Sequence, residues 1–312
     1  MNDAKFLNKA LQGTRVSGPW RVTVWKRQDQ SQQEKKNVWV FSEEHENRGA
    51  CGLEVSQTDL TDLVSRIVKN TERVHVFLEH FVHAVDVTRT CSLDDSVSTL
   101  TRLRNCLGID QQQQNDNRIH FVDPRTDLVA VLPNGKIYEA VVRYADHLRR
   151  RGNRLELKLL LYETFVHPLL SIVDPDGKLQ GRLNVVMQRY LASMTPSQYL
   201  FFTLKWQNDV ILNVRHVYQV YHELSESNEN SIMPLLDAYT DMVNKFTDLW
   251  LLANFFKADN DSRGGMTGAI VYAGSKHSLN FEKYLAEMQY DLLEQTTNQD
   301  LSACLTLPTL PP

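Results

Sequence analysis

Two segments of the chain place a histidine close behind an apolar run. Residues 38–41 (Val-Trp-Val-Phe) lead into Ser-Glu-Glu-His at 42–45, and residues 269–273 (Ala-Ile-Val-Tyr-Ala) lead into Gly-Ser-Lys-His at 274–277. Short apolar runs rich in β-branched and aromatic residues are typical of strands buried on both faces. An imidazole beside a carboxylate is a general base for water, and histidines with carboxylates also suit a divalent metal that activates water. The pattern predicts a hydrolytic site in one of these two forms.

A second element of the same kind lies between these segments. Residues 74–78 are predicted to form a strand that ends at Glu79 and His80, and apolar residues within 60–68 are spaced as one face of a helix. Strand, helix and strand in this order predict a βαβ unit with parallel strands and a right-handed crossover. In open parallel sheets, ligands bind at the carboxyl ends of the strands. We therefore expect Glu43 with His45 to lie near Glu79 with His80.

A third strand is predicted at residues 118–125, where Asp123 and Arg125 fall at the same carboxyl edge. Arg125 could neutralise Asp123 or bind an anionic group of a substrate. His75 and His120 lie inside strand runs, so a structural role is favoured for both. The glutamine tract at 111–114, behind a predicted helix at 99–107, is expected to be a polar loop.

The middle of the chain, from about residue 138 to 256, is helical in pattern almost throughout. Residues 195–198 (Thr-Pro-Ser-Gln) form a capping box with proline at the first helical position. The fold class expected is α/β, a mainly parallel sheet flanked by helices with a long helical insertion or cap. The expected division is 1–137 for the first part of the α/β core, 138–257 for the helical insertion, and 258–312 for the last core strand, closing helix and frayed tail.

The overall charge gives no reason to expect nucleic acid or an anionic membrane as a partner. Formal net charge is -4 over 312 residues, with 42% hydrophobic and 23% charged residues. The basic run Arg149 to Arg151 ends a predicted helix, where it complements the helix dipole. The N-terminus lacks the apolar core of a signal peptide, and no run is long enough to cross a bilayer.

The four cysteines are scattered without a CxxC pair. This spacing suggests neither a disulfide framework nor a thiolate zinc site. An intracellular, reducing setting is therefore expected.

The three strand ends together resemble a superfamily that unites the erythromycin esterase-like proteins, the ChaN-like haem-binding lipoproteins and the TIKI/TraB hydrolases. Its first strand typically ends in Gly-Glu-x-His, a second ends in Glu and a late one in Gly-x-x-His; the matching residues here are 42–45, Glu79 and 274–277. The layout also resembles uncharacterised open reading frames of large DNA viruses, which implies the host cytoplasm or the virion as the setting if the protein is viral. The chain departs from the superfamily in two places. Ser42 replaces the glycine of the first motif. The TIKI/TraB proteins carry an arginine in the helix before Gly-x-x-His, and the comparable residues 248–254 here contain none.

The resemblance implies a hydrolase-like protein with an unknown small-molecule or peptide substrate. It implies His45 as base or metal ligand, Glu43 as its orienting group or co-ligand, and His277 as second base or ligand. Glu79 and Asp123 would be supporting carboxylates, with Glu79 a further ligand in the metal-bound form, and Arg125 would bind an anionic group. The departures motivate an alternative, a non-catalytic virus-encoded protein that keeps the fold and binds host proteins or haem. The sequence leaves the oligomeric state open.

Overall fold

The structure, a computed structural model of the chain, divides it into two compact units. The sheet unit comprises Met1–Asp123 and Lys257–Pro312, and the helical unit comprises Pro124–Phe256. The described residues are 2–28, 36–44, 59–81, 99–114, 118–125, 136–170, 182–226, 231–260, 265–298 and 304–310. The predicted site residue His45 lies outside these ranges, and for His80 the backbone alone is described.

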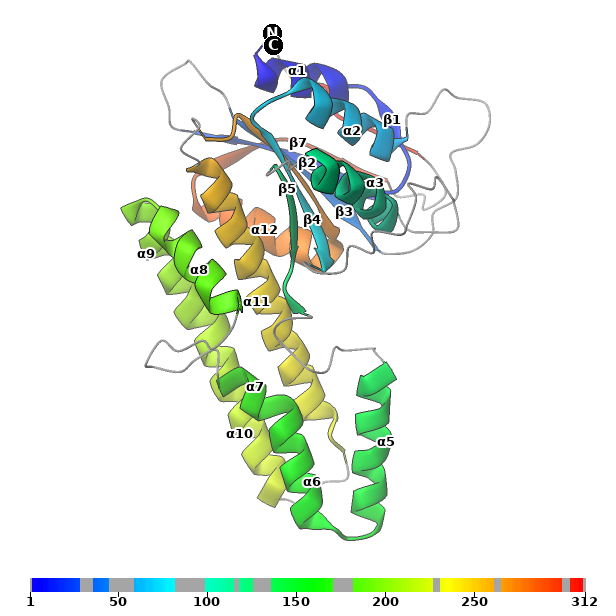
Figure 1. Cartoon of the computed structure of the whole chain (residues 1–312), viewed down its shortest axis with the longest axis vertical. Helices are drawn as coiled ribbons and strands as arrows, with labels where there is room; N and C mark the ends of the chain where they lie inside the picture. Colours follow the sequence, from blue (N-terminus) through cyan, green and yellow to red (C-terminus); the bar gives the residue numbers. More distant parts are fainter. Residues whose placement is uncertain are drawn as a thin grey trace. The chain divides into compact units, whose positions relative to one another are not determined.

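The sheet unit is an α/β structure with helices on both faces of a mixed sheet (Figure 1). Its elements are α1 (Asp3–Leu11), β1 (Arg15–Val16), β2 (Arg21–Arg27), β3 (Asn37–Glu43), α2 (Leu60–Asn70), β4 (Val74–Phe81), α3 (Thr99–Gln114), β5 (Ile119–Asp123), β6 (Gly268–Gly274), α12 (Ser275–Glu287), β7 (Tyr290–Thr297) and β8 (Leu305–Thr306). The expected fold class, a mainly parallel sheet flanked by helices with a long helical region, is confirmed.

The main sheet has six strands in the order β5-β4-β6-β3-β2-β7. β5, β4, β6 and β3 run parallel, whereas β2 pairs antiparallel with both of its neighbours. The two predicted strands that precede the histidine motifs pair directly, with Val40 opposite Val271. β3 and β4 are parallel as predicted, but β6 lies between them, so their carboxyl ends are one strand further apart than in a simple βαβ unit.

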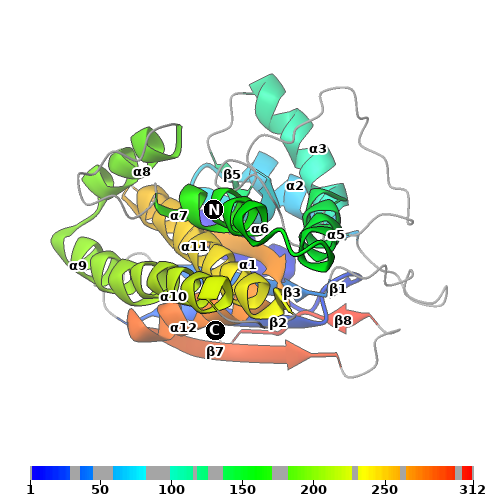
Figure 2. The ribbon, with the colours of Figure 1, turned by 90° about the horizontal axis from the view of Figure 1, so that it is seen from below.

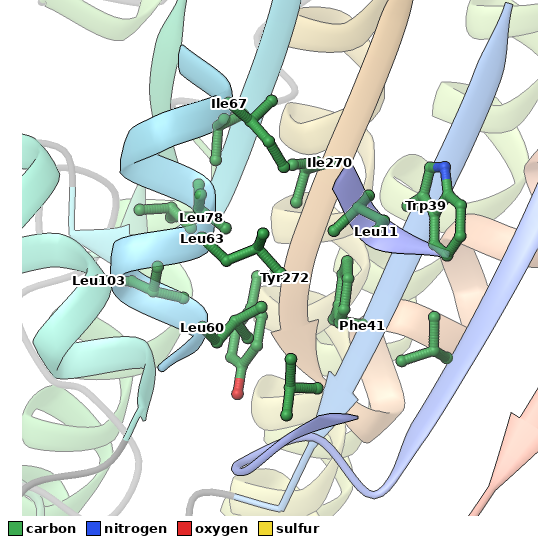
Figure 3. Packing of buried hydrophobic residues seen from close by; sticks show 14 of the residues in the cluster. Leu11, Trp39, Phe41, Leu60, Leu63, Ile67, Leu78, Leu103, Ile270 and Tyr272 are labelled. Atoms are coloured by element: carbon green, nitrogen blue, oxygen red, sulfur yellow. The ribbon is translucent and has the colours of Figure 1, made fainter. Parts of the chain in front are cut away.

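One face of the sheet is covered by α1, α2 and α3. The apolar stripe of α2 supplies Leu60, Leu63 and Ile67, and α3 supplies Leu103 (Figure 3). These side chains pack on Trp39 and Phe41 of β3, Ile270 and Tyr272 of β6, and Leu78 of β4. Asp59 begins α2 by accepting hydrogen bonds from the N–H groups of Thr61 and Asp62, which confirms the predicted cap.

The other face of the sheet carries α12, which runs beside β7 in Figure 2. Phe281 and Leu285 of α12 are fully buried. Arg21 of β2 donates from both terminal nitrogens to the Glu282 carboxylate, at 2.9 and 2.6 Å, and the Thr23 hydroxyl donates to it at 2.8 Å. A bidentate pair of this kind fixes orientation as well as distance, so α12 is held in one position against the sheet.

The helical unit forms its own core from aromatic and aliphatic side chains. Its elements are α5 (Lys136–Arg150), α6 (Arg154–Leu161), the π-helical segment η1 (Tyr162–Val166), α7 (His167–Leu170), α8 (Arg182–Ser193), α9 (Pro196–Lys205), the π-helical segment η2 (Trp206–Ile211), α10 (Leu212–Glu226) and α11 (Met233–Asp259), which ends in the sheet unit. Aromatic pairs such as Phe165 with Tyr239, and Trp206 with Phe246, meet edge to face. The predicted capping box of Thr195 and Gln198 is present.

The structure corrects two sequence predictions about polar or proline-rich segments. The glutamine tract at 111–114 forms the last turn of α3 rather than a loop, because straight-chain glutamine is a good helix former. The tail predicted to be frayed instead forms β8, which pairs with β1 and buries Leu305 and Leu307. β2 and β7, which have polar residues at or near their ends, were not predicted as strands of the sheet.

The cysteines also depart from the sequence prediction. Cys106 of α3 and Cys304, next to β8, are each disulfide-bonded, so the expectation of no disulfides is wrong for both. Sequence spacing reports only local pairs, whereas the fold brings distant cysteines together. No helix within the described ranges is long and apolar enough to span a bilayer.

Candidate functional site at the carboxyl edge of the sheet

The predicted site residues within the described ranges fall at the carboxyl ends of the parallel strands. Glu43 ends β3, Glu79 lies near the end of β4, and Asp123 ends β5. His277 stands in the first turn of α12, directly behind β6. All four are almost fully buried, with 2 to 6% of each residue exposed.

Glu79 and His277 form a buried carboxylate–imidazole pair. His277 Nε2 lies 3.3 Å from Glu79 Oε1, and their side chains are 7% and 3% exposed. The other carboxylate oxygen, Oε2, accepts the Gly274 N–H at 2.7 Å. The carboxylate is therefore held from two directions, and it in turn fixes the position of the histidine ring.

The start of α12 explains why Glu79 occupies this place. Gly274 is the N-cap residue and has no side chain that could accept a hydrogen bond. The Glu79 carboxylate, which comes from a neighbouring strand, accepts the N–H of this residue, where the helix dipole favours negative charge. Ser275 binds the same turn to β3, since its hydroxyl donates to the Glu43 carbonyl oxygen and accepts from Trp20 Nε1.

Glu43 is engaged by a different partner, the tyrosine of the neighbouring strand. Tyr272 donates its hydroxyl to Glu43 Oε2 at 2.5 Å, inside the core. Burial and the negative charge of Glu43 raise the pKa of Tyr272 well above its ordinary value, against smaller opposing effects of Thr99 and Arg102. Arg102 in turn donates to Asp59 at 3.2 Å. The tyrosine thus stays protonated and acts as a fixed hydrogen-bond donor.

The two carboxylates lie on opposite faces of the sheet. Side chains alternate between faces along a strand. Phe41 of β3 belongs to the core under α2 and α3, which puts Glu43 on that face. Leu78 of β4 belongs to the same core, so Glu79 lies on the face covered by α12. We expected Glu43, Glu79 and His277 to meet in one cleft; the structure brings the last two together and sets Glu43 beside Tyr272.

The remaining sequence candidates belong to different parts of the fold. Asp123 lies opposite Phe81 in the register of β4 with β5. Arg125 is partly buried and belongs to the helical unit. His75 and His120 form a mutual contact, Nδ1 to Nε2 at 2.9 Å, and stack on Phe77, which agrees with the structural role predicted for them.

Sequence reasoning missed Tyr272, Thr99 and Arg102. Tyr272 stood inside a strand run and was counted as core, and 229 residues separate it from Glu43. The register between two parallel strands that are so distant in the sequence cannot be predicted from the residues of either strand alone. A signal was nevertheless available for Tyr272, because a buried tyrosine hydroxyl usually finds a hydrogen-bond partner.

A divalent metal was predicted as one form of the site. In the part of the chain that the structure describes, no group of three or more His, Cys, Asp or Glu side chains could hold a metal ion. Glu79 and His277 supply two donors on one face, and Glu43 lies on the other. The described residues thus do not make a metal centre by themselves, and a metal-bound form that includes His45 stays a prediction.

Comparisons with protein-family models, curated proteins and solved structures found no match to this chain. The resemblance to the erythromycin esterase, ChaN and TIKI/TraB superfamily stays a prediction that depends on the quoted motifs.

Proposed function

We propose that the chain is a hydrolase-like protein whose acid–base group is His277, held by Glu79. The observation that carries the proposal is the 3.3 Å contact between His277 Nε2 and Glu79 Oε1 at the carboxyl edge of a parallel sheet. Such an edge is where ligands bind in open α/β folds. The pair joins an imidazole, the side chain that most often serves as a general acid or base, to a buried carboxylate.

The proposed chemistry follows from the protons that this pair can move. The imidazole takes a proton from water as the water attacks an ester, peptide or phosphoester centre, and it returns that proton to the leaving group. Glu79 stabilises the imidazolium in between and keeps the ring in place. Asp123 and Arg125 remain proposed supporting and anion-binding groups, and Glu43 with His45 remains the proposed second pair of the site.

The test compares hydrolysis of ester, peptide and phosphoester substrates by the wild type and by His277→Ala. We expect a loss of about 10²–10⁴-fold in rate for the substrate class that is turned over. His216→Ala is the matched control, because His216 is an exposed histidine of α10 and should leave the rate unchanged. Unchanged turnover in His277→Ala, with circular dichroism showing both variants folded, would contradict the proposal.

Metal analysis of the purified protein separates the two forms of the site. A stoichiometric metal that is lost in both His45→Ala and His277→Ala would establish the metal-bound form. If the purified protein contains no metal and its activity persists in the presence of a strong chelator, the metal-bound form is excluded and the metal-free chemistry is supported.

A second candidate function is non-catalytic binding, and one observation favours it. Nine of the eleven large apolar side chains that are exposed among the described residues lie in the helical unit. Exposed apolar surface is typical of interaction sites. Haem binding, the other form of this alternative, is tested by a Soret band on titration that substitution of His45 or His277 abolishes.

The setting of the protein follows from its cysteines. Because Cys106 and Cys304 are disulfide-bonded and disulfides persist where thiols are not kept reduced, we propose that, if the protein is viral, the virion is a better setting than the host cytoplasm.

A further inference from the structure

The turn between α5 and α6 collects basic and apolar side chains at exposed positions. We define the α5–α6 tip as residues 146–159, at one end of the helical unit (Figure 1). The tip holds five basic residues against two acidic ones, a local formal charge of +3 in a chain whose net charge is -4. The basic residues are Arg149, Arg150, Arg151, Arg154 and Lys158, and the acidic ones are Asp146 and Glu156. The tip is therefore locally basic although the net charge of the whole chain is negative.

Two leucines of the tip are exposed to an unusual degree. Leu155 is 81% and Leu159 58% exposed. They stand four residues apart on α6, so they project from the same face of the helix. Arg154 and Lys158, both exposed, stand next to them in the chain. The face thus presents apolar groups with positive charges beside them.

Both acidic side chains of the tip have partners on α5 or in the turn. Asp146 Oδ1 lies 3.6 Å from Arg149 Nη1. The Glu156 carboxylate accepts from the Tyr144 hydroxyl and from Asn153 Nδ2. These two donors to Glu156 are neutral, and the five basic residues of the tip outnumber its two acidic ones.

The backbone of the tip is already fixed. Gly152, with φ of +68°, makes the tight turn, and its N–H bonds to the Arg149 carbonyl oxygen at 2.9 Å. The Asn153 N–H bonds to the Leu148 carbonyl oxygen at 3.0 Å. A surface held in this way loses little backbone entropy when it docks.

We propose that the α5–α6 tip docks on an anionic lipid surface. Exposed leucines fit the boundary between headgroups and acyl chains, and neighbouring arginines and lysines fit lipid phosphates and carboxylates. A lipid surface can accept the α5–α6 tip without a preformed groove. A nucleic acid, by contrast, has no apolar site for the two leucines. The inference is independent of the proposed hydrolytic activity, and it departs from the expectation drawn from net charge.

The test is co-sedimentation of the full chain with vesicles of phosphatidylcholine alone or of phosphatidylcholine with phosphatidylserine. We expect binding to the anionic vesicles only, weakened by added salt. Leu155→Ser with Leu159→Ser should lower the affinity about tenfold or more. Arg150→Glu with Lys158→Glu should lower it by at least about fivefold for each position.

The chain offers a matched control for the leucine variant. Leu200 and Leu204 of α9 are 61% and 54% exposed and also stand four residues apart. Leu200→Ser with Leu204→Ser should leave vesicle binding unchanged. An equal loss in this control, or no preference for anionic vesicles in the wild type, would overturn the proposal. So would binding to soluble polyglutamate without vesicle binding, which would indicate an acidic protein partner.

Discussion

The carboxyl edge of the sheet carries two buried carboxylates whose partners differ in kind. Glu79, on the α12 face, lies 3.3 Å from the imidazole of His277. Glu43, on the face of α2 and α3, accepts the hydroxyl of Tyr272 at 2.5 Å. Burial and the negative charge of Glu43 raise the pKa of this tyrosine well above its ordinary value, so it holds its proton in place. The imidazole pair is the one that we propose moves protons.

This difference shows that motif position alone does not assign a role. Both carboxylates follow apolar strands and both end at the same edge. Their roles differ because successive side chains of a strand face opposite sides of the sheet. The comparison makes Glu79 and His277 the centre of the proposed acid–base chemistry, and it makes the Glu43–Tyr272 pair a fixed part of the supporting core.

The largest effect on stability is expected from Glu79→Ala. The variant removes the acceptor of the Gly274 N–H and leaves His277 buried without its carboxylate. Breaking a buried pair in this way costs about 3–5 kcal/mol of unfolding free energy, measured by urea denaturation.

Two further variants sharpen this prediction. Glu79→Gln keeps an oxygen for the Gly274 N–H and should lose only about 1–3 kcal/mol. Glu72→Ala, at an exposed glutamate, should change stability by less than about 0.5 kcal/mol. Equal losses in Glu79→Ala and Glu72→Ala would mean that the buried carboxylate does not hold the start of α12.

Reduction of the disulfide bonding of Cys106 and Cys304 should weaken the part of the core that surrounds the Glu43–Tyr272 pair. Cys106 belongs to α3, which also supplies Thr99 and Arg102 near Tyr272. Loss of a native disulfide typically costs about 2–4 kcal/mol. Denaturation with and without dithiothreitol measures the total loss, and hydrogen exchange should show α3 losing protection before α12. Unchanged stability on reduction would contradict a structural role for these bonds.

Tyr272→Phe tests the second pair directly. The variant keeps the ring that packs on Leu60 and Leu63 but removes the hydroxyl that Glu43 accepts (Figure 3). A buried carboxylate that loses a donor costs about 1–3 kcal/mol. Tyr199→Phe, at a half-exposed tyrosine of α9, is the control and should be neutral. A neutral Tyr272→Phe would show that the Glu43 carboxylate does not depend on this hydroxyl.

The parts of the fold that were predictable depend on local signals. The apolar runs of β3 and β6 and the Asp59 cap of α2 can each be recognised within a few residues. The shared edge of Glu43 and Glu79 followed from the βαβ pattern, which makes their strands parallel. These signals predicted that Glu43 and Glu79 lie at the carboxyl ends of parallel strands, where the structure has them.

The parts that were missed depend on contacts between distant segments. The partner of Glu43 is set by the register of β3 against β6, which neither strand specifies alone. The tail at 304–310 contains a proline and only two strand residues, yet Leu305 and Leu307 are buried because β1 offers an edge. The position of β6 between β3 and β4 decided which groups meet, and no local pattern encodes it.

The smallest effect of a single substitution is expected at alkaline pH, where variants of the two pairs should respond differently. Burial raises the pKa of Tyr190 to about 12 and also raises those of Tyr239, Tyr272 and Tyr290. In the unfolded chain these hydroxyls lose their protons near pH 10 while the folded chain keeps them, so the unfolded state binds fewer protons. The unfolding free energy should therefore fall above pH 10, by about 1.4 kcal/mol per pH unit for each such tyrosine. Urea denaturation between pH 8 and 11 would measure this slope, which Tyr272→Phe should make shallower by one tyrosine's share. His277→Asn should keep the wild-type slope, because it leaves all four buried tyrosines in place; an equal change in both variants would mean that the two pairs respond as one unit.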